Sequence, residues 1–340
     1  MNAIGEPRVL LRVEGLSVEF GPKGARLRVV DEVSFEIEAG ETVGLVGESG
    51  SGKSITALSI LRLVPEPPSH LAGGRVLLDG IDLTALPRDR LPEIRGRDIA
   101  MIFQEPMSSL NPVMRIGDQI GEAILLHQTL GAAARRSRVL ELLGLVGIPD
   151  PEQRIDAFPH QFSGGMRQRV MIAMALACNP RLLIADEPTT ALDVTIQAQV
   201  LALLRDLKAR LGTATLLITH DLGVVAESCQ RVVVMYAGRV VETGSVRDIF
   251  RRPSHPYTRA LLQSIPRLDE ERRRLHQIPG NVPPPGPLRA GCAFHTRCAD
   301  RLPRCSVDRP PAARIGPGHE AACWLVQEAA APSRSEALNR

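Results

Sequence analysis

The sequence predicts an α/β fold with a largely parallel sheet between layers of helices. Short, wholly apolar runs recur at 42–46, 98–103 and 181–186, and each is typical of a strand buried on both faces of a sheet. Segments with helical spacing separate these runs, and strands that alternate with helices form such three-layer domains. The first residues differ, because 9–20 and 28–38 alternate with period two, as antiparallel strands with one solvated face do.

The other expected elements follow in chain order. A helix leaves the glycine-rich loop that comes after the first apolar run, and a helix with a glycine stop precedes the last strands. We expect helices at 55–64, at 113–147 (two, separated near Gly131), at 165–178 and at 195–212, a hairpin at 74–83 that turns at Asp79-Gly80, and strands at 214–221 and 231–244.

Composition changes near residue 250. The last ninety residues hold 15 of the 41 basic residues but only 8 of the 38 acidic ones, together with 13 of the 27 prolines. We therefore divide the chain into a first domain, 1–250, and a short, irregular, Cys- and Pro-rich C-terminal extension, 251–340.

Several classes of protein are excluded or disfavoured by composition. No run approaches the ~20 apolar residues of a membrane-spanning helix. The N-terminus lacks the basic start and apolar stretch of a secretory signal, which predicts a cytosolic protein. The basic extension has two interpretations, a solvated surface or a contact with a partner subunit or anionic headgroups. Nucleic-acid binding is disfavoured, because the extension has almost no aromatic residues on which bases could stack.

A glycine-rich loop, GESGSGKS, follows the first apolar run. It matches G-x-x-x-x-G-K-[ST] between a predicted strand and a predicted helix, the context of a phosphate-binding loop. Its backbone N–H groups and the positive end of the helix would surround phosphate oxygens. Lys53 would bind the β- and γ-phosphates, and the Ser54 hydroxyl would bind Mg²⁺. The predicted nucleotide-binding residues are Gly47, Glu48, Ser49, Gly50, Ser51, Gly52, Lys53 and Ser54.

Two adjacent carboxylates, Asp186 and Glu187, end the apolar run at 181–186. Open α/β sheets bind ligands at the carboxyl ends of their strands. Asp186 would support the Mg²⁺ shell, and Glu187 would orient or deprotonate water as a general base. A base beside a metal ligand favours hydrolysis over the phosphoryl transfer of a nucleotide kinase, and no N-K-x-D guanine motif follows.

A second anion-binding pattern, FSGGMRQR, starts a predicted helix at Ser163. One nucleotide does not need two phosphate cradles from one chain. We therefore expect two chains to face each other, each offering Ser163, Gly164 and Gly165 to the nucleotide of the other. An ordinary helix N-cap followed by glycines is the simpler alternative.

Taken in order, these motifs resemble those of ATP-binding cassette (ABC) ATPases over roughly residues 8–250. The resemblance implies a cassette with a RecA-like parallel core sheet, an antiparallel β subdomain and a helical subdomain at about 105–165. The block at 162–200 and the tail that begins at His255 are similar to the ATPases of dipeptide/oligopeptide importers. Those proteins carry a C-terminal extension of about this size, so the resemblance covers nearly the whole chain.

The resemblance implies further roles. Gln104 matches the Q-loop, which senses the γ-phosphate and Mg²⁺ and contacts the membrane partner. Asp193 lies in the D-loop at the dimer seam, and His220 matches the switch histidine that contacts the γ-phosphate. Phe20 is the candidate for the adenine-stacking aromatic, with an apolar strand residue as the alternative. The implied catalytic residues are Glu187, His220 and Gln104, and the implied Mg²⁺ residues are Ser54, Gln104 and Asp186. The signature departs from the common L-S-G-G-Q at Phe162 and Met166.

The function implied by the resemblance is that of an ATP-binding and hydrolysing subunit of an importer for di- or oligopeptides. Its partners would be two integral membrane permease subunits, a second ATPase chain (a paralogue or a second copy) and, through the permeases, an extracytoplasmic solute-binding protein. It would lie at the cytoplasmic face of the bacterial inner membrane. The same role for nickel or another solute stays open, as does a non-transport cassette ATPase acting on DNA or ribosomes.

Four of the six cysteines lie in the extension, separated by 5, 6 and 17 residues: Cys292, Cys298, Cys305 and Cys323. Stable disulfides are disfavoured in a reducing cytosol, and four thiols suit Zn²⁺ or an iron–sulfur cluster. The C-x₂₋₄-C pairs of zinc ribbons are absent, and some of the resembled importers carry a 4Fe–4S cluster on such a tail. Unliganded packing thiols are the alternative. Cys178 and Cys229 are most simply small buried residues.

Overall fold

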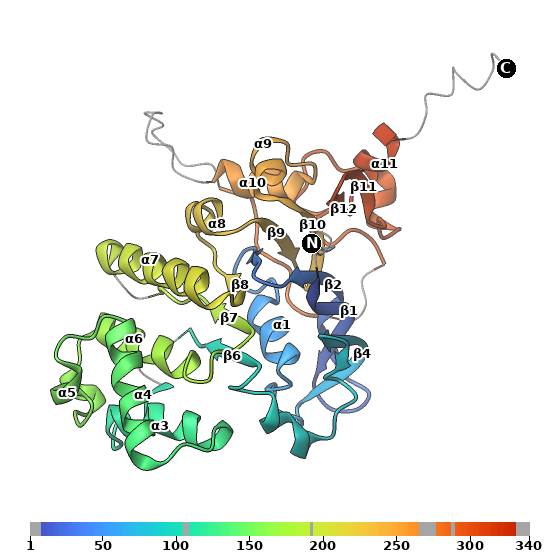
Figure 1. Ribbon diagram of the computed structural model, residues 1–340. Helices are drawn as coiled ribbons and strands as arrows, with labels where there is room; N and C mark the ends of the chain where they lie inside the picture. The colour runs from blue at the N-terminus through green and yellow to red at the C-terminus, as the bar shows by residue number, and fades with distance from the viewer. Residues whose placement is uncertain (1–7, 105–108, 191–192, 265–276, 287–289, 331–340) are drawn as a thin grey trace, which may run out of the picture. The chain divides into compact units, whose positions relative to one another are not determined.

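The computed structural model describes residues 8–104, 109–190, 193–264, 277–286 and 290–330 (Figure 1). The chain divides into two compact units. The first comprises Met1–Arg12, Glu36–Thr42 and Val76–Ile218, and the second comprises Val13–Phe35, Val43–Arg75 and Thr219–Arg340. Ala191 and Leu192, which precede Asp193 in the D-loop motif, lie outside the described residues.

The first unit contains three parallel strands, β6 (Ile99–Ile102), β7 (Leu182–Asp186) and β8 (Ala214–Ile218). β7 is the middle strand, because it pairs with β6 along one edge and with β8 along the other. Every residue of β7 and β8 is buried, and all of them except Asp186 and Thr215 are apolar. This explains why the sequence shows wholly apolar runs instead of alternation.

Four helices of the first unit form one group. α3, α4, α5 and α6 lie together (green in Figure 1), and α6 also packs on β6 and α7. Gly131 precedes α4, and Gly212 ends α7 in the left-handed conformation with φ 67°. The bounds are η1 Arg88–Glu93, α3 Ile116–His127, α4 Ala132–Leu145, α5 Pro151–Arg154, η2 Pro159–Gln161, α6 Gly164–Ala175 and α7 Val194–Leu211.

A separate four-stranded sheet has the order β2-β1-β4-β5. Its strands are β1 (Val9–Phe20), β2 (Leu27–Glu38), β4 (Ser69–Leu78) and β5 (Ile81–Asp82). The first three strands each contribute residues to both units. The predicted hairpin is confirmed, since Leu78 pairs with Ile81 and the turn residues Asp79 and Gly80 both have positive φ.

The second unit contains strands that pair both in parallel and antiparallel. β3 (Thr42–Val46) pairs in parallel with β9 (Arg231–Tyr236), and β9 forms a hairpin with β10 (Arg239–Ser245). β10 pairs on its other edge with β12 (His319–Ala321), which pairs with β11 (Ala313–Gly316). The remaining elements are α1 Lys53–Ile60, α8 Leu222–Ser228, α9 Val246–Arg251, α10 Pro256–Gln263, η3 Pro303–Ser306 and α11 Trp324–Ala330.

The structure confirms the predicted α/β class and differs in the extension. The sequence predicts an irregular tail, but β11, β12, α10 and α11 give it regular structure. β12 is three residues long, too short to show a period, and its partner β10 lies about eighty residues earlier. Among the described residues, no helix is long and apolar enough to span a membrane.

Candidate active site

The loop between β3 and α1 follows the path that its glycines permit. A side chain at Gly47 is sterically impossible, because its Cβ would lie 2.2 Å from the carbonyl oxygen of Met235 on β9. Gly52, the residue before α1, has φ 97°, a conformation that favours glycine. The loop therefore lies directly against β9 and turns sharply into α1, as a phosphate-binding loop must.

Lys53 is held inside this loop. Its side chain is buried, with 6% exposure, and its Nζ donates to the carbonyl oxygens of Gly47 (2.8 Å) and Glu48 (3.0 Å). Ser54 is half-buried in the first turn of α1. A buried ammonium surrounded by loop carbonyls is a compact positive charge beside the helix N-terminus. The second unit thus places the two residues expected to bind phosphate and Mg²⁺ side by side.

The carboxylates at the end of β7 lie in the first unit. Asp186 is buried, with 4% exposure, and Glu187 follows it with φ 45°. Such a left-handed conformation at a non-glycine residue is strained, and strain of this kind clusters at functional sites. It turns Glu187 out of the strand direction while its N–H donates to the carbonyl of Ile218 on β8 (2.9 Å).

Gln104 lies beside Glu187, because both residues follow neighbouring parallel strands at the same edge of the sheet. The Gln104 Nε2 donates to Glu187 Oε2 (3.1 Å), and the Thr190 hydroxyl donates to the same oxygen (2.8 Å). Two donors orient this carboxylate, which suits a base that must face a water molecule. Sequence analysis did not predict the contribution of Thr190.

The second anion-binding pattern forms the start of α6 in the first unit. Ser163 caps the helix, since its Oγ accepts from the N–H of Met166 (3.3 Å). Ser163 and Gly164 are exposed, and a side chain at Gly165 would meet Ile196 Cγ2 at 2.8 Å. Phe162 is buried at 3% exposure, so this departure from the common leucine keeps an apolar core position. The start of α6 is therefore exposed, as an anion-binding helix N-terminus must be.

Asp193, His220 and Phe20 are the other predicted site residues. Asp193 in the first unit is exposed and caps α7 by accepting from the N–H of Ile196 (3.0 Å). His220 in the second unit is exposed and lies just after the end of β8. Phe20 ends β1 and is half-buried rather than part of the core. Within the first unit the structure brings Gln104 and Glu187 together.

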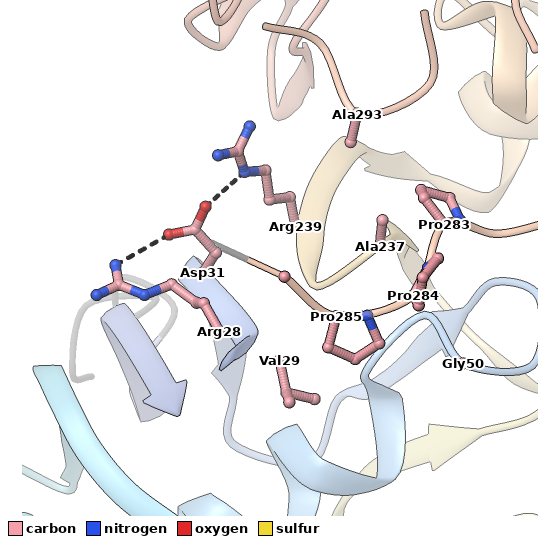
Figure 2. A pocket seen from close by; sticks show the side chains of 11 residues that line it. Arg28, Val29, Asp31, Gly50, Ala237, Arg239, Pro283, Pro284, Pro285 and Ala293 are labelled. Atoms are coloured by element: carbon pink, nitrogen blue, oxygen red, sulfur yellow. Dashed lines mark hydrogen bonds and ion pairs between the residues drawn. The ribbon is translucent and has the colours of Figure 1, made fainter. Parts of the chain in front are cut away.

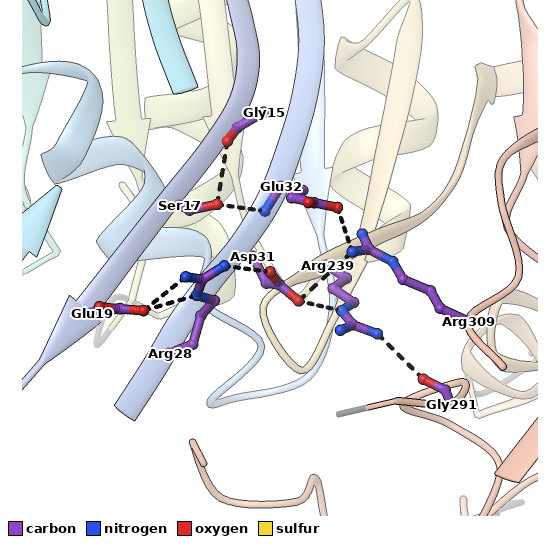
Figure 3. Close-up of polar contacts among 9 residues, drawn as sticks. All are labelled: Gly15, Ser17, Glu19, Arg28, Asp31, Glu32, Arg239, Gly291 and Arg309. Atoms are coloured by element: carbon purple, nitrogen blue, oxygen red, sulfur yellow. Dashed lines mark hydrogen bonds and ion pairs between the residues drawn. The ribbon is translucent and has the colours of Figure 1, made fainter. Parts of the chain in front are cut away.

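Charged side chains that sequence analysis missed connect β2 and β10 to the extension, whose described residues from 251 on form the C-terminal segment of the second unit (Figure 3). Asp31 on β2 accepts from Arg239 Nε (2.6 Å) and Arg28 Nη1 (3.2 Å), and Arg239 Nη1 donates to the carbonyl of Gly291 (3.3 Å). Burial raises the pKa of Asp31, but hydrogen bonds and charges from Arg239, Arg28 and Arg309 outweigh this effect and lower it. No local sequence pattern marks such long-range pairs.

The C-terminal segment also reaches the phosphate-binding loop. Pro283, Pro284 and Pro285 line a small hollow together with Gly50 of the loop and Ala237 of the β9–β10 turn (Figure 2). The backbone N–H of Arg28 donates to the carbonyl of Gly286 (3.2 Å). The proline-rich stretch at 283–286 therefore lies against the loop and β2.

The four cysteines of the extension line one small cavity with His255 and Phe294. Burial raises the pKa of Cys292 to about 11 and also raises the pKa values of Cys298 and Cys323. Burial lowers the pKa of His255 to about 3, so this histidine is neutral. Its Nδ1 accepts from the N–H of Tyr257 (3.0 Å), and its buried Nε2 has no hydrogen-bond partner in the structure.

Four thiols around one hollow are the ligand type that holds an iron–sulfur cluster. Within the part of the chain that the structure describes, however, no group of three or more His, Cys, Asp or Glu side chains has the arrangement of a metal-ion site. Cys229 is buried and Cys178 half-buried, both as free thiols.

A phosphate-binding loop in one unit, and adjacent carboxylates that end a buried strand in the other, define a P-loop nucleotide hydrolase. Comparison with known proteins gives the family. The family model described as ABC transporter matches residues 30–190, and the model described as oligopeptide/dipeptide transporter, C-terminal region, matches residues 241–305.

Individual relatives match over nearly the whole chain. A probable peptide ABC transporter ATP-binding protein of Sinorhizobium fredii is 54% identical over 94% of this chain and 96% of its own length. The oligopeptide transport ATP-binding protein AppD of Bacillus subtilis is 51% identical over 94% of this chain and 97% of its own. Among solved structures, the dimeric, post-hydrolysis cassette MJ0796 bound to ADP and Pi has a TM-score of 0.63 at 28% identity, covering 70% of this chain and 99% of that one.

The chain therefore belongs to the ATP-binding proteins of oligopeptide/dipeptide ABC transporters. It is an ABC-type ATPase with the cassette fold that the motifs predict.

Proposed function

We propose that this protein binds and hydrolyses ATP as a subunit of an importer that couples hydrolysis to the uptake of di- or oligopeptides through permease subunits. The observation that carries the peptide assignment is the match of residues 241–305 to the C-terminal region of oligopeptide/dipeptide transporters. Relatives named for peptide, oligopeptide or dipeptide transport, each matching 94% of this chain at 48–54% identity, support it.

Each predicted site residue has a proposed role in this reaction. Lys53 and the N–H groups of residues 47–54 bind the phosphates, and Ser54, Gln104 and Asp186 serve the Mg²⁺ ion. Glu187 is the general base for the attacking water, and His220 contacts the γ-phosphate. The contact between Gln104 and Glu187 supports a shared function at the strand ends. Phe20 is proposed to stack on adenine, and its partial exposure is compatible with that role.

The dimeric role of the second anion-binding pattern is also a proposal. Ser163, Gly164 and Gly165 would bind the nucleotide of a second ATPase chain, with Asp193 at the seam. The exposure of Ser163 and Gly164 at the start of α6 supports it. We further propose that residues 1–250 form the ATPase domain, with a helical subdomain at about 105–165, and that 251–340 form the family-specific extension.

The proposed partners are two integral membrane permease subunits, a second ATPase chain that is a paralogue or a copy, and a solute-binding protein that acts through the permeases. The chain would then work at the cytoplasmic face of the inner membrane. The test is to purify the complex with its permeases in lipid and to measure ATP hydrolysis with the solute-binding protein loaded with defined peptides or with nickel. Stimulation by peptide supports the proposal, whereas stimulation by nickel alone, or by neither, overturns the peptide assignment.

We also propose that Cys292, Cys298, Cys305 and Cys323 hold a 4Fe–4S cluster. The common cavity of the four thiols supports this. Because burial raises the pKa values of Cys292, Cys298 and Cys323, loading would release protons. The cluster would supply a cross-link between four points of the extension. Anaerobically purified protein should contain iron, acid-labile sulfide and the visible absorbance of such a cluster. Protein that contains zinc, or neither metal, would refute it.

A further inference from the structure

Glu48, the second residue of the phosphate-binding loop, is bound twice by residues of the C-terminal segment. Its carboxylate forms a two-pronged pair with Arg297, at 2.6 Å from Nη1 to Oε2 and 3.1 Å from Nη2 to Oε1. Its backbone N–H donates to the hydroxyl oxygen of Tyr257 (2.8 Å). These partners lie 249 and 209 residues away in the sequence. Both the side chain and the backbone of one loop residue are therefore fixed from the same distant segment.

Arg297 is itself rigidly held. Its Nε donates to the carbonyl of Pro279 (2.7 Å), and its Nη2 also donates to the carbonyl of Ile278 (3.2 Å). Its Nη1 contacts the Tyr236 hydroxyl at 3.3 Å, and the guanidinium lies 5.7 Å from the centre of that ring. The side chain is only 6% exposed. A planar guanidinium with several donors in use cannot be replaced by the single ammonium of lysine.

An aromatic cluster supports both contacts to Glu48. Tyr257 is fully buried, and its ring lies 4.7 Å from that of Tyr236 and 5.3 Å from that of Phe294. The chain has only ten aromatic residues, and both of its tyrosines belong to this cluster. Burial raises the pKa of the Tyr257 hydroxyl, so this group stays neutral and accepts the loop N–H. The cluster thus holds two polar groups at fixed positions behind the loop.

The same loop residue also contacts the phosphate-binding lysine. The carbonyl of Glu48 accepts from Lys53 Nζ (3.0 Å), so Tyr257 and Lys53 bind Glu48 through its N–H and its carbonyl oxygen, respectively. In addition, Arg297 offsets the negative charge of a carboxylate within a loop that must attract phosphate. Both effects favour anion binding, one by pre-organising the loop and the other by removing a repulsive charge.

We infer that Arg297 and Tyr257 are positioning residues for ATP, and that the C-terminal segment sets the nucleotide affinity of the phosphate-binding loop through Glu48. The inference rests on the proposed role of residues 47–54 in phosphate binding. It gives the extension a task in ATP binding that is separate from any metal that its cysteines hold.

The test compares the steady-state kinetics of MgATP hydrolysis for the full chain and its variants. Arg297→Gln should raise KM for MgATP about tenfold, the usual consequence of losing a charge-assisted hydrogen bond, with a much smaller change in kcat. Tyr257→Phe should raise KM about fivefold, since it removes one neutral hydrogen bond and retains the ring. Arg297→Lys should not restore the parent KM.

The matched control is Arg259→Gln, which breaks the exposed pair between Arg259 and Asp300 in the same segment. Its KM should equal that of the parent. A merely structural role for Arg297 would lower kcat through a smaller active fraction and leave KM unchanged, and that result would overturn the inference. Lys53→Ala distinguishes a failure of the proposed phosphate-binding role of the loop from a failure of the inference about Arg297. If Lys53→Ala binds MgATP as the parent does, the phosphate-binding role is wrong. If Lys53→Ala binds weakly but Arg297→Gln has the parent KM, only the inference is wrong.

Discussion

The two units position their site residues in different ways. In the first unit, Gln104 and Glu187 meet because they follow neighbouring parallel strands, so the sheet itself brings them together. In the second unit, the loop around Lys53 is held by side chains from the C-terminal segment, chiefly Tyr257 and Arg297. The position of the Glu187 carboxylate, the proposed base, therefore depends on local topology. The loop at residues 47–54 depends instead on contacts between residues more than two hundred positions apart.

The rate of ATP hydrolysis and the affinity for ATP should therefore depend on different parts of the molecule. Substitutions at the strand ends of the first unit should change the rate of hydrolysis, because they alter a base and its orientation. Substitutions in the C-terminal segment of the second unit should change how well ATP binds, because they alter the loop.

The largest effect is expected for Glu187→Gln in the first unit. Loss of the general base should lower kcat by about 10²–10⁴-fold, while MgATP still binds with parent affinity. Phosphate release and equilibrium nucleotide binding measure the two properties. Thr190→Val removes only one donor to the same carboxylate and should reduce kcat far less. Parent-like hydrolysis by the Glu187 variant would show that another group is the base.

Lys53→Ala in the second unit should have the opposite profile. It removes a buried positive charge from the loop, so MgATP binding should weaken by roughly tenfold to a hundredfold. Titration with a fluorescent ATP analogue measures this. Lys208→Ala, on α7 of the first unit, is the matched control and should bind nucleotide normally. Equal MgATP affinities for Lys53→Ala and Lys208→Ala would show that Lys53 does not bind the nucleotide.

Glu242→Gln should destabilise the attachment of the C-terminal segment. The buried carboxylate of Glu242 accepts from the N–H groups of Ser254 (2.7 Å) and His255 (2.9 Å) and contacts His319 Nε2 (2.9 Å). An amide cannot accept from all of these donors, so the free energy of unfolding should fall by about 2–3 kcal/mol. Chemical denaturation measures it. Glu320 is exposed on β12, so Glu320→Gln should leave the free energy of unfolding nearly unchanged. Equal losses of stability in the two variants would show that the hydrogen bonds of Glu242 do not stabilise the fold.

The smallest effect is a pH dependence in the second unit. Because the folded-state pKa of Asp31 is lowered, its contribution to stability is present above the unfolded pKa of about 3.9 and is lost as the pH falls through the folded pKa. The stability gap between the parent and Asp31→Asn should therefore be constant near neutral pH and narrow below about pH 4. A gap that does not change with pH would show that Asp31 carries no lowered pKa.

Much of the fold follows from local sequence patterns. The apolar runs predict β3, β6 and β7, and the Asp79-Gly80 turn predicts its hairpin. The motifs also locate the loop and both carboxylates. In contrast, nothing near Glu48 indicates Arg297 or Tyr257, since a pair separated by more than two hundred residues leaves no period or spacing. The three-residue strand β12 is hidden for a related reason, because only its pairing with β10 defines it.

The most direct test of the central claim is amide hydrogen exchange of the phosphate-binding loop in the full chain. If the C-terminal segment fixes the loop through Glu48, amides of residues 47–52 should exchange faster in Arg297→Gln than in the parent, and at the parent rate in Arg259→Gln. Exchange in this loop that is unchanged by Arg297→Gln would contradict the account.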